Sequence, residues 1–459
     1  MQGTILNAKA ESRKEAPRIM LIHARSAAVC AAALYFLTCA NSARAPAAER
    51  MSAAHASIQA ADASRHIHAL ADDAFEGREG GRRGGRAAGT YIVGAIEKLG
   101  LQPAGDNGSF FQNFGGMRNI LALLPGSDPV LAHELVVVGA HYDHVGYGNL
   151  NNSYGPTGFI HNGADDNASG VAGLIEIAEA FQQLPHRPRR SVLFAFWDGE
   201  EKGLLGSYHF LRVRPAALSQ FKIVFSVNLD MIGRLRGQRV EVFGARTSPG
   251  LRMAALRANQ AVNLELVYDW EITDDSDHYP FIAAKIPTVM FHTGLHDQYH
   301  RPSDDTHLIN FPGIEPVTRL TFDFVTEIAD ESQPARAFRP DCRHESAVQR
   351  QALEAPAAAA APMPAGQRPR WGMGTRSDPG EPTAPVVVRI TPGSPLAKAG
   401  MALGDRVVSI DGMALASQDD MLAKLANAGE SVTVEVDRKG RIVRLEPAIE
   451  ARPAVVGND

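Results

Sequence analysis

The sequence has little cysteine, with Cys30, Cys39 and Cys342 as the three cysteines among 459 residues. Cys30 and Cys39 lie in an apolar N-terminal stretch, so a chain cleaved after this stretch keeps one thiol and forms no internal disulfide. This excludes a disulfide-stapled scaffold and leaves the hydrophobic core as the source of stability. With 45% hydrophobic and 21% charged residues, the chain is long enough for two or three globular domains.

The sequence also lacks a strong charge of either sign. Its formal net charge is -5, and the two signs are mixed along the chain. No basic stripe marks a nucleic-acid surface, so we expect no nucleic-acid partner. No His-Glu-x-x-His motif occurs, which disfavours the thermolysin-like class of zinc enzymes. We find no internal repeat.

The apolar N-terminal run is short. Ser26 to Ala40 is rich in apolar and small residues, but it is too short to span a bilayer comfortably. Basic residues precede this run, and Ala43-Arg-Ala45 fits a small-x-small cleavage pattern. We therefore predict a signal peptide over residues 1–45, with Met20 as a possible true start.

A signal peptide implies export, so we expect a periplasmic or secreted protein with no stable membrane span after cleavage. A retained membrane anchor is the alternative. Phe36-Leu-Thr-Cys39 is a poor lipoprotein box, which makes a lipid anchor at Cys39 the weaker possibility.

Strand and helix patterns alternate from about residue 63 to residue 332. The predicted strands include Asn119 to Leu124, Leu135 to Gly139, Ser191 to Trp197, Lys222 to Leu229, Val240 to Phe243, Leu264 to Tyr268 and Thr288 to His292. The predicted helices include Ala88 to Leu99, Ala168 to Leu184, Gly203 to Arg212, Pro249 to Gln260, Asp277 to Ala284 and Gly313 to Ala329. This alternation predicts an α/β domain with a mostly parallel sheet covered on both faces. Ligands of such sheets gather at the carboxyl ends of the strands.

The remaining segments have a different composition. Residues 46–62 are Ala-rich and predict a flexible lead-in, and residues 333–369 form an Ala/Pro-rich linker. Residues 370–450 alternate again and predict a second, small β/α domain, which residues 451–459 follow as a tail.

Two acidic segments carry the strongest chemical signal. Gly163-Ala-Asp-Asp-Asn-Ala-Ser-Gly170 and Asp198-Gly-Glu-Glu-Lys-Gly203 both place adjacent carboxylates just before a predicted helix. Like charges side by side resist burial in a core, whereas a divalent metal site needs them. We therefore interpret both segments as parts of a metal site.

Histidines and further carboxylates arrive at the same sheet edge. His141, Asp230 and His300 follow predicted strands or lie in the loops beyond them, and Asp143 comes two residues after His141. Imidazole nitrogen and carboxylate oxygen are ligands of zinc. Other histidines near these positions are weaker candidates, namely His133, His144, His161, His292, His296 and His307.

Each acidic pair offers two different roles. Either Asp165 or Asp166 could bridge two ions, and spacing alone does not choose between them. One of Glu200 and Glu201 can ligate a metal ion while its neighbour takes a proton from bound water.

The order of these motifs resembles that of the M28 zinc aminopeptidases over roughly residues 65–330. The shared pattern is His-x-Asp, Gly-Ala-Asp-Asp-Asn-x-Ser-Gly, Glu-Glu-x-Gly-Leu-x-Gly-Ser, Asp-Met, Ser-Asp-His and a final His before a Ser/Thr-Asp turn. The resemblance implies a three-layer α/β/α sandwich around a mixed sheet. It also implies hydrolysis of the N-terminal peptide bond of peptides that have a free N-terminus.

The same resemblance implies a role for each matched residue. His141 and Asp230 would bind one zinc ion, Glu201 and His300 a second, and Asp166 would bridge the two ions. Glu200 would be the general base and Asp143 would orient His141. The peptide bond between Asp166 and Asn167 is expected to be cis.

Two features depart from the family pattern. Some members place a tyrosine shortly before Ser-Asp-His, whereas Thr273-Asp-Asp-Ser276 stands there in this chain. The stretch between Phe114 and Leu135 is too short for an inserted protease-associated domain.

The small C-terminal domain resembles a bacterial PDZ domain. Trp371-Gly-Met-Gly374 is similar to a carboxylate-binding loop, and Pro392 to Gly400 and Gly404 to Gly412 are similar to later PDZ signatures. The resemblance implies capture of a peptide C-terminus or strand. The alternative is a small β domain that only packs on the peptidase.

Three functions stay open on this reading. The first is an exported two-zinc aminopeptidase. The second is a related zinc amidohydrolase of the carboxypeptidase or cyclotransferase type. The third is a non-catalytic peptide-binding protein that acts through the PDZ-like domain.

Overall fold

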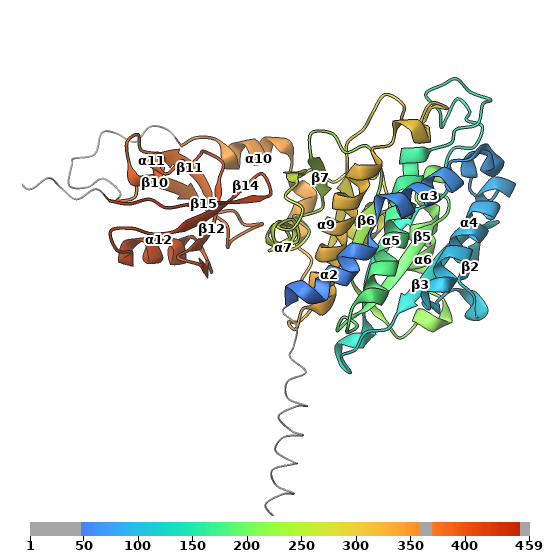
Figure 1. The fold of residues 1–459 in the computed structure, drawn as a ribbon, viewed down its shortest axis with the longest axis horizontal. Helices are drawn as coiled ribbons and strands as arrows, with labels where there is room; N and C mark the ends of the chain where they lie inside the picture. Colours follow the sequence, from blue (N-terminus) through green and yellow to red (C-terminus); the bar gives the residue numbers. More distant parts are fainter. Residues whose placement is uncertain (1–46, 358–369, 450–459) are drawn as a thin grey trace, which may run out of the picture. The chain divides into compact units, whose positions relative to one another are not determined.

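The computed structural model describes residues 47–357 and 370–449 (Figure 1). The expected signal peptide, with Met20 and Cys39, lies outside these residues, as do the tail and the second part of the linker. Within the described ranges, no helix combines the length and the apolar character that a membrane span requires.

A nine-stranded mixed sheet forms the centre of the larger domain. Its strands are β1 (Gln102–Pro103), β2 (Phe111–Phe114), β3 (Met117–Leu124), β4 (Glu134–His141), β5 (Ser191–Trp197), β6 (Lys222–Leu229), β7 (Arg239–Phe243), β8 (Glu265–Tyr268) and β9 (Thr288–His292). Their spatial order is β1-β3-β5-β4-β6-β9-β7-β8, with β2 paired to β3. The central strands β5, β4, β6 and β9 are parallel to one another, and antiparallel pairs join them to the margins.

Helices cover both faces of this sheet, as Figure 1 shows. The helices described up to the second domain are α2 (Ala47–Ser57), α3 (Ala60–Leu70), α4 (Arg83–Ile96), α5 (Gly170–Gln183), α6 (Leu205–Arg212), α7 (Leu251–Ala258), α8 (His278–Ala283), α9 (Phe311–Asp330) and α10 (Ala347–Glu354). On one face, Phe181 of α5 contacts Phe194 of β5 and Phe322 of α9, with ring centroids 5.8 and 5.1 Å apart. On the other face, Phe210 of α6 and Phe281 of α8 pack against Trp197. The expected α/β/α sandwich is confirmed.

The chain begins its described part as helix rather than as the expected flexible lead-in. Helix α2 ends at Ser57, and Ala54 and Ile58 are buried together with Ala63 and Ile67 of the next helix. Small and branched side chains at this spacing give one apolar face, and Arg319 of α9 donates hydrogen bonds to the His55 carbonyl. Residues 46–62 therefore contribute to the core where the structure describes them.

The first part of the expected linker is also ordered. Helix α10 lies within it, with Ser346 as the N-cap accepting from the Gln349 N–H. Arg350 of this helix donates to the Tyr268 carbonyl at 2.7 Å. The Ala/Pro composition misses this helix because its polar residues Gln349, Arg350 and Gln351 precede the low-complexity run.

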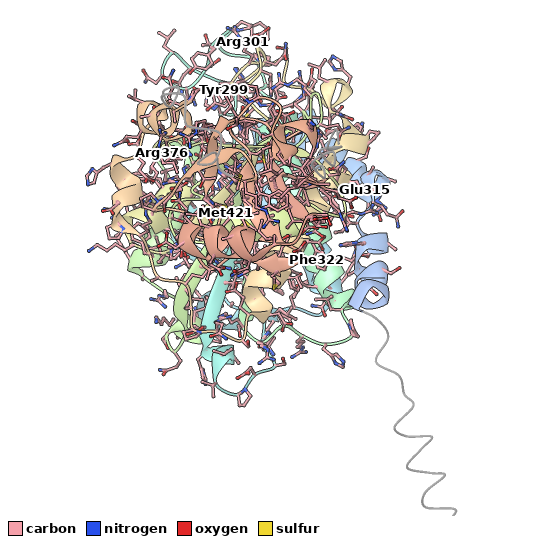
Figure 2. The ribbon with its side chains drawn as sticks, turned by 90° about the vertical axis from the view of Figure 1, so that its left-hand side faces the viewer. Tyr299, Arg301, Glu315, Phe322, Arg376 and Met421 are labelled. Atoms are coloured by element: carbon pink, nitrogen blue, oxygen red, sulfur yellow. The ribbon has the colours of Figure 1, made fainter. Side chains whose placement is uncertain are left out.

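The second domain is an antiparallel sheet with two helices. Its elements are β10 (Met373–Arg376), β11 (Val386–Ile390), α11 (Pro395–Lys398), β12 (Arg406–Ile410), β13 (Met413–Ala414), α12 (Gln418–Asn427), β14 (Val434–Arg438) and β15 (Arg441–Leu445). The strand order is β10-β11-β12-β14-β15, with β13 on β12. Buried Met421 of α12, labelled in Figure 2, belongs to its core with Trp371 and Val434. The expected PDZ-like β/α architecture is confirmed.

One buried carboxyl group in α5 makes stability depend on pH. Glu176 is 1% exposed, and its Oε2 accepts the Gln59 N–H at 3.0 Å while Oε1 has no hydrogen-bond partner among the described residues. Burial raises the pKa of Glu176 from 4.5 to about 8. The folded chain therefore holds a proton that the unfolded chain releases, and this group lowers stability as pH rises from about 5 to 8.

We expect Glu176→Gln to remove this dependence. The Tm of the variant relative to the wild type should rise by about 3 °C or more between pH 5 and pH 8.5, measured by scanning fluorimetry. Glu179→Gln, on the same helix but partly exposed, is the matched control. A relative Tm that does not change with pH would show that Glu176 ionises normally in the folded chain.

Candidate metal centre

Parallel strands bring the predicted site residues to one edge of the sheet. His141 ends β4 and pairs in register with Trp197, the last residue of β5, while Asp230 directly follows β6. Glu200 and Glu201 lie in the short turn after β5. Because neighbouring parallel strands end at the same edge, segments far apart in sequence meet there.

The first group of side chains centres on His141. Its Nε2 lies 3.3 Å from Asp166 Oδ1 and 3.4 Å from Asp230 Oδ1. Its Nδ1 lies 3.1 Å from the backbone carbonyl of Asp143, which can only accept a hydrogen bond, so Nδ1 carries a proton. Nε2 is therefore the ring atom that is free to bind a metal ion.

Asp143 supports the site in a way that the spacing did not predict. Its carbonyl, not its carboxylate, takes the hydrogen bond from His141; the nearest carboxylate oxygen is 3.9 Å from Nδ1. The carboxylate accepts the backbone N–H of Glu200 at 3.1 Å. Asp143 therefore joins the β4 end to the turn that bears both glutamates.

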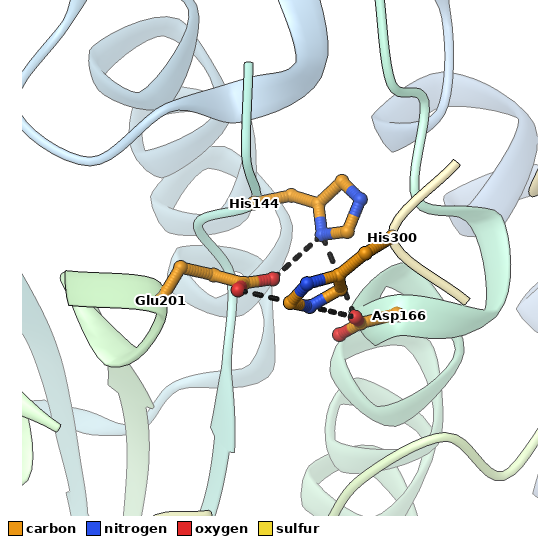
Figure 3. A group of neighbouring side chains, drawn as sticks. All are labelled: His144, Asp166, Glu201 and His300. Carbon is orange, nitrogen blue, oxygen red and sulfur yellow. Dashed lines mark hydrogen bonds and ion pairs between the residues drawn. The ribbon is translucent and has the colours of Figure 1, made fainter. Parts of the chain in front are cut away.

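The second group contains His144, Asp166, Glu201 and His300 (Figure 3). His300 Nε2 lies 3.2 Å from Asp166 Oδ2 and 3.0 Å from Glu201 Oε2. His144 Nδ1 lies 2.8 Å from Glu201 Oε1 and 3.6 Å from Asp166 Oδ2. Asp166 thus presents one oxygen to each group.

His144 is a weaker candidate from the sequence alone, but the structure brings it into the site. Its side chain is fully buried, and its ring meets that of His300 edge to face at 5.6 Å. This position allows two roles, as a donor that orients Glu201 or as a further ligand of the second group. The sequence feature that could have predicted His144 as a site residue is its position just beyond a buried strand, beside Asp143.

Asp166 is held from several sides. Asp304 Oδ2 accepts the backbone N–H groups of Asp165 and Asp166, each at 3.0 Å. Asn167 donates to the Leu229 carbonyl and accepts from the Met231 N–H, which ties the acidic turn to the end of β6. The Asp166–Asn167 peptide is cis, as the family resemblance implied.

Arg78 is a second residue that sequence reasoning missed. Its buried guanidinium donates to the carbonyls of Leu70, Tyr142, Asn162, Gly163 and Asp166. Burial lowers the pKa of Arg78 to about 10, so it stays charged at neutral pH. This cation fixes the backbone behind Asp166 and offsets part of the local negative charge.

The electrostatics of the two groups suit a cation. Burial opposes ionisation of Asp166, but the imidazoles of His144, His141 and His300 hold its pKa well below the usual range. Burial raises the pKa of the Glu200 carboxyl well above its ordinary value. The two glutamates of one turn therefore differ, since contacts with His144 and His300 lower the pKa of Glu201 to about 2 despite its burial.

Two buried carboxylate oxygens lack partners at the centre of the site. Asp166 Oδ2 and Asp230 Oδ1 have no hydrogen-bond partner among the described residues, yet each faces an imidazole nitrogen. Unpaired buried acceptors are costly unless a cation satisfies them. The donor set of imidazole nitrogens and carboxylate oxygens fits zinc.

A cavity of about 350 Å³ opens beside these residues. His141, Asp166, Glu200 and Asp230 line one side of it. Tyr299, labelled in Figure 2, lines it as well and stacks on His300 with ring centroids 3.9 Å apart. Among the described residues the Tyr299 hydroxyl has no hydrogen-bond partner, and burial raises its pKa, so it remains a proton donor.

The second domain carries a cavity of its own, of about 430 Å³. It lies between edge strand β10 and helix α12, and its lining includes Trp371, Gly372, Met421 and Leu425. Arg370 and Arg389 also line it. An edge strand beside an apolar groove and two cations can accept an extended peptide with a terminal carboxylate.

The comparisons with known proteins agree with this architecture. Residues 119–325 match the model of Peptidase family M28, and residues 370–448 match that of the PDZ domain. The chain therefore contains an M28 peptidase domain followed by a PDZ domain.

Particular relatives are distant. The chain is similar to Leupeptin-inactivating enzyme 1 of Streptomyces exfoliatus, at 28% identity over 46% of this chain and 43% of that protein. It is similar to Aminopeptidase YwaD of Bacillus subtilis, at 26% identity over 45% of this chain and 44% of that protein. The chain thus spans less than half the length of either relative.

Among solved structures, the LapA aminopeptidase of Legionella pneumophila has the same fold. The TM-score is 0.52 at 18% identity, and the match covers 62% of this chain and 76% of that chain.

Proposed function

We propose that this protein is a zinc-dependent aminopeptidase that hydrolyses the N-terminal peptide bond of peptides and holds two ions per chain. The observation that carries the proposal is the position of Asp166, whose two oxygens face two separate groups of ligands. His141 and Asp230 would complete one ion site, and Glu201 and His300 the other. This assignment accounts for the unpaired buried oxygens of Asp166 and Asp230.

Zinc held by these residues would supply Lewis acidity, which would lower the pKa of water and polarise a carbonyl. Glu200 lines the same cavity and is the proposed general base. Its carboxylate would accept the proton of the attacking water and return it to the leaving amine. The backbone N–H of Glu200 is held by Asp143, and the Tyr299 hydroxyl would donate to the oxyanion that develops on the substrate.

The cavity favours an aminopeptidase over a carboxypeptidase. A carboxypeptidase binds a free carboxylate and needs a cation for it. The described residues that line the cavity include no lysine or arginine, whereas several carboxylates do line it. A free α-amine fits such surroundings. Glu200 also argues against a purely non-catalytic protein, since a structural metal site needs no base.

The test is hydrolysis of aminoacyl chromogenic amides by the zinc-loaded protein, with and without a chelator. We expect cleavage that is lost on chelation and restored by zinc. N-terminally acetylated versions of the same amides are the control and should resist cleavage. Cleavage of the acetylated amides at equal rates would contradict an aminopeptidase, and no cleavage of any amide would favour a peptide-binding role.

For the PDZ domain, the proposed ligand is a peptide C-terminus that adds to β10. Residues 1–45 support export to the periplasm or secretion, with lipid attachment at Cys39 as the weaker alternative. N-terminal sequencing of the protein from the cell envelope and the medium tests this. A mature chain that still begins at Met1 or Met20 would contradict signal-peptide cleavage.

A further inference from the structure

The cavity beside the metal centre is amphipathic. Its apolar lining includes Met231, Met290 and Phe243, and the two methionines are buried. Its outer wall carries the carboxylates of Asp269, Glu271 and Asp275, of which the last two are exposed. A long apolar stem that ends in a positive charge matches this division.

The outer carboxylates are not neutralised within the described part of the chain. Glu241, also in the wall, accepts a hydrogen bond from Arg239 at 3.0 Å. In contrast, Asp269, Glu271 and Asp275 have no ion pair among the described residues, and Asp269 and Glu271 accept only backbone N–H groups. The wall therefore keeps a negative charge that a bound cation would offset.

The acidic wall belongs to the same cavity as the reacting residues. Glu200 lines this cavity, and so does Asp230, whose Oδ1 is buried and has no hydrogen-bond partner in the described chain. The α-amine of a substrate is attached to the carbon beside the scissile carbonyl, so it stays near Glu200 and the metal ligands. The side chain of the first residue is therefore the part of the substrate that can reach the outer wall.

We propose that this cavity selects peptides whose first residue is lysine or arginine. The inference rests on the proposed aminopeptidase function and adds its substrate class. The aliphatic stem would pack on Met231, Phe243 and Met290, and the ammonium or guanidinium group would reach Asp269, Glu271 and Asp275. A first residue with a carboxylate side chain would be rejected by the same wall.

The test compares side chains that share a stem and differ in charge. For the zinc-loaded full chain, we expect kcat/KM for lysyl and arginyl amides at least about 10-fold above that for the norleucyl amide, with the glutamyl amide the slowest. The preference should shrink as salt rises, because the wall is exposed. Equal rates for lysyl and norleucyl amides, or a fastest glutamyl amide, would overturn the inference and leave the proposed function standing.

Neutral substitutions of similar shape test whether the wall carboxylates produce the preference. Glu271→Gln combined with Asp275→Asn should lower the lysyl-to-norleucyl ratio of kcat/KM about 10-fold, mainly through KM. Asp274→Asn is the matched control, because Asp274 is exposed, adjacent and outside the cavity lining. A ratio that is unchanged in the double variant would overturn the role of these carboxylates.

A binding measurement separates this inference from the proposed function. Calorimetry with lysinamide and norleucinamide needs no turnover, and lysinamide should bind at least about 10-fold more tightly. Tighter binding without hydrolysis of any amide would sustain the inference and overturn the aminopeptidase. Hydrolysis of the amides with equal binding of lysinamide and norleucinamide would sustain the aminopeptidase and overturn the inference.

Discussion

Glu200→Gln is expected to reduce kcat for a chromogenic amide by at least ~10³-fold while the protein keeps its zinc. The substitution preserves the shape of the side chain but removes the group that takes and returns the proton. The backbone N–H of Glu200 would still donate to Asp143, so the turn that bears Glu201 stays in place. Metal content is measured by elemental analysis of the same preparation that is assayed.

An alternative role for Glu200 is that of a metal ligand. His141, Glu200 and Glu201 form a further group whose ligand atoms could surround an ion. If Glu200 were a ligand, Glu200→Gln would lose zinc as sharply as it loses activity. Glu79→Gln is the control, because this carboxylate pairs with Lys202 at the exposed side of the same turn and lies outside the cavity lining.

Asp166→Ala is expected to lose both ions, whereas His300→Ala loses one. Asp166 contributes an oxygen to each group, and His300 to the second group alone. Removing the shared carboxylate leaves His141 and Asp230 on one side. On the other side it leaves Glu201 and His300, if His144 orients Glu201 and does not bind the ion. Two ligands are too few for either ion. Zinc per chain after dialysis against zinc-free buffer, read by elemental analysis, distinguishes the two variants.

The wild type should retain about two ions under the same dialysis. Asp305→Ala provides the control, since Asp305 lies in the His300 loop and contacts Asn162 rather than the proposed ligands. One ion per chain in Asp166→Ala, at the occupancy of His300→Ala, would show that the two groups bind independently and that Asp166 does not bridge them.

The sequence predicted accurately the strands that carry the site, and the reason is physical. Leu135 to Val138 are apolar without interruption and are all buried in β4, as expected for a central strand covered on both faces. A polar residue directly after such a run has to lie at the sheet edge. His141 and Asp230 could therefore be proposed as site residues from the pattern of apolar residues alone. The two acidic turns could be proposed because each directly precedes a predicted helix.

Other parts of the site were not visible in this way. His144 comes only three residues after His141, and its Nδ1 lies 2.8 Å from Glu201 Oε1, a contact across 57 positions that arises only in the folded chain. Arg78 lies far upstream with no motif around it, and its role consists of donating to carbonyls from three separate segments, at Leu70, at Tyr142 and at residues 162–166. Every residue has a backbone carbonyl, so the sequence does not indicate which carbonyls accept these hydrogen bonds.

The amino-acid sequence by itself determined the kind of chemistry, because residue type decides which atoms can bind a metal ion or move a proton. It also determined the sheet edge at which they would meet, because apolar runs and turn residues mark where strands end. Only the tertiary structure decided which oxygen of Asp166 faces which imidazole and that the Asp143 carbonyl holds His141. The acidic cavity wall likewise depends on loops that come together only in the folded chain, since their contacts are long-range and their spacing is irregular.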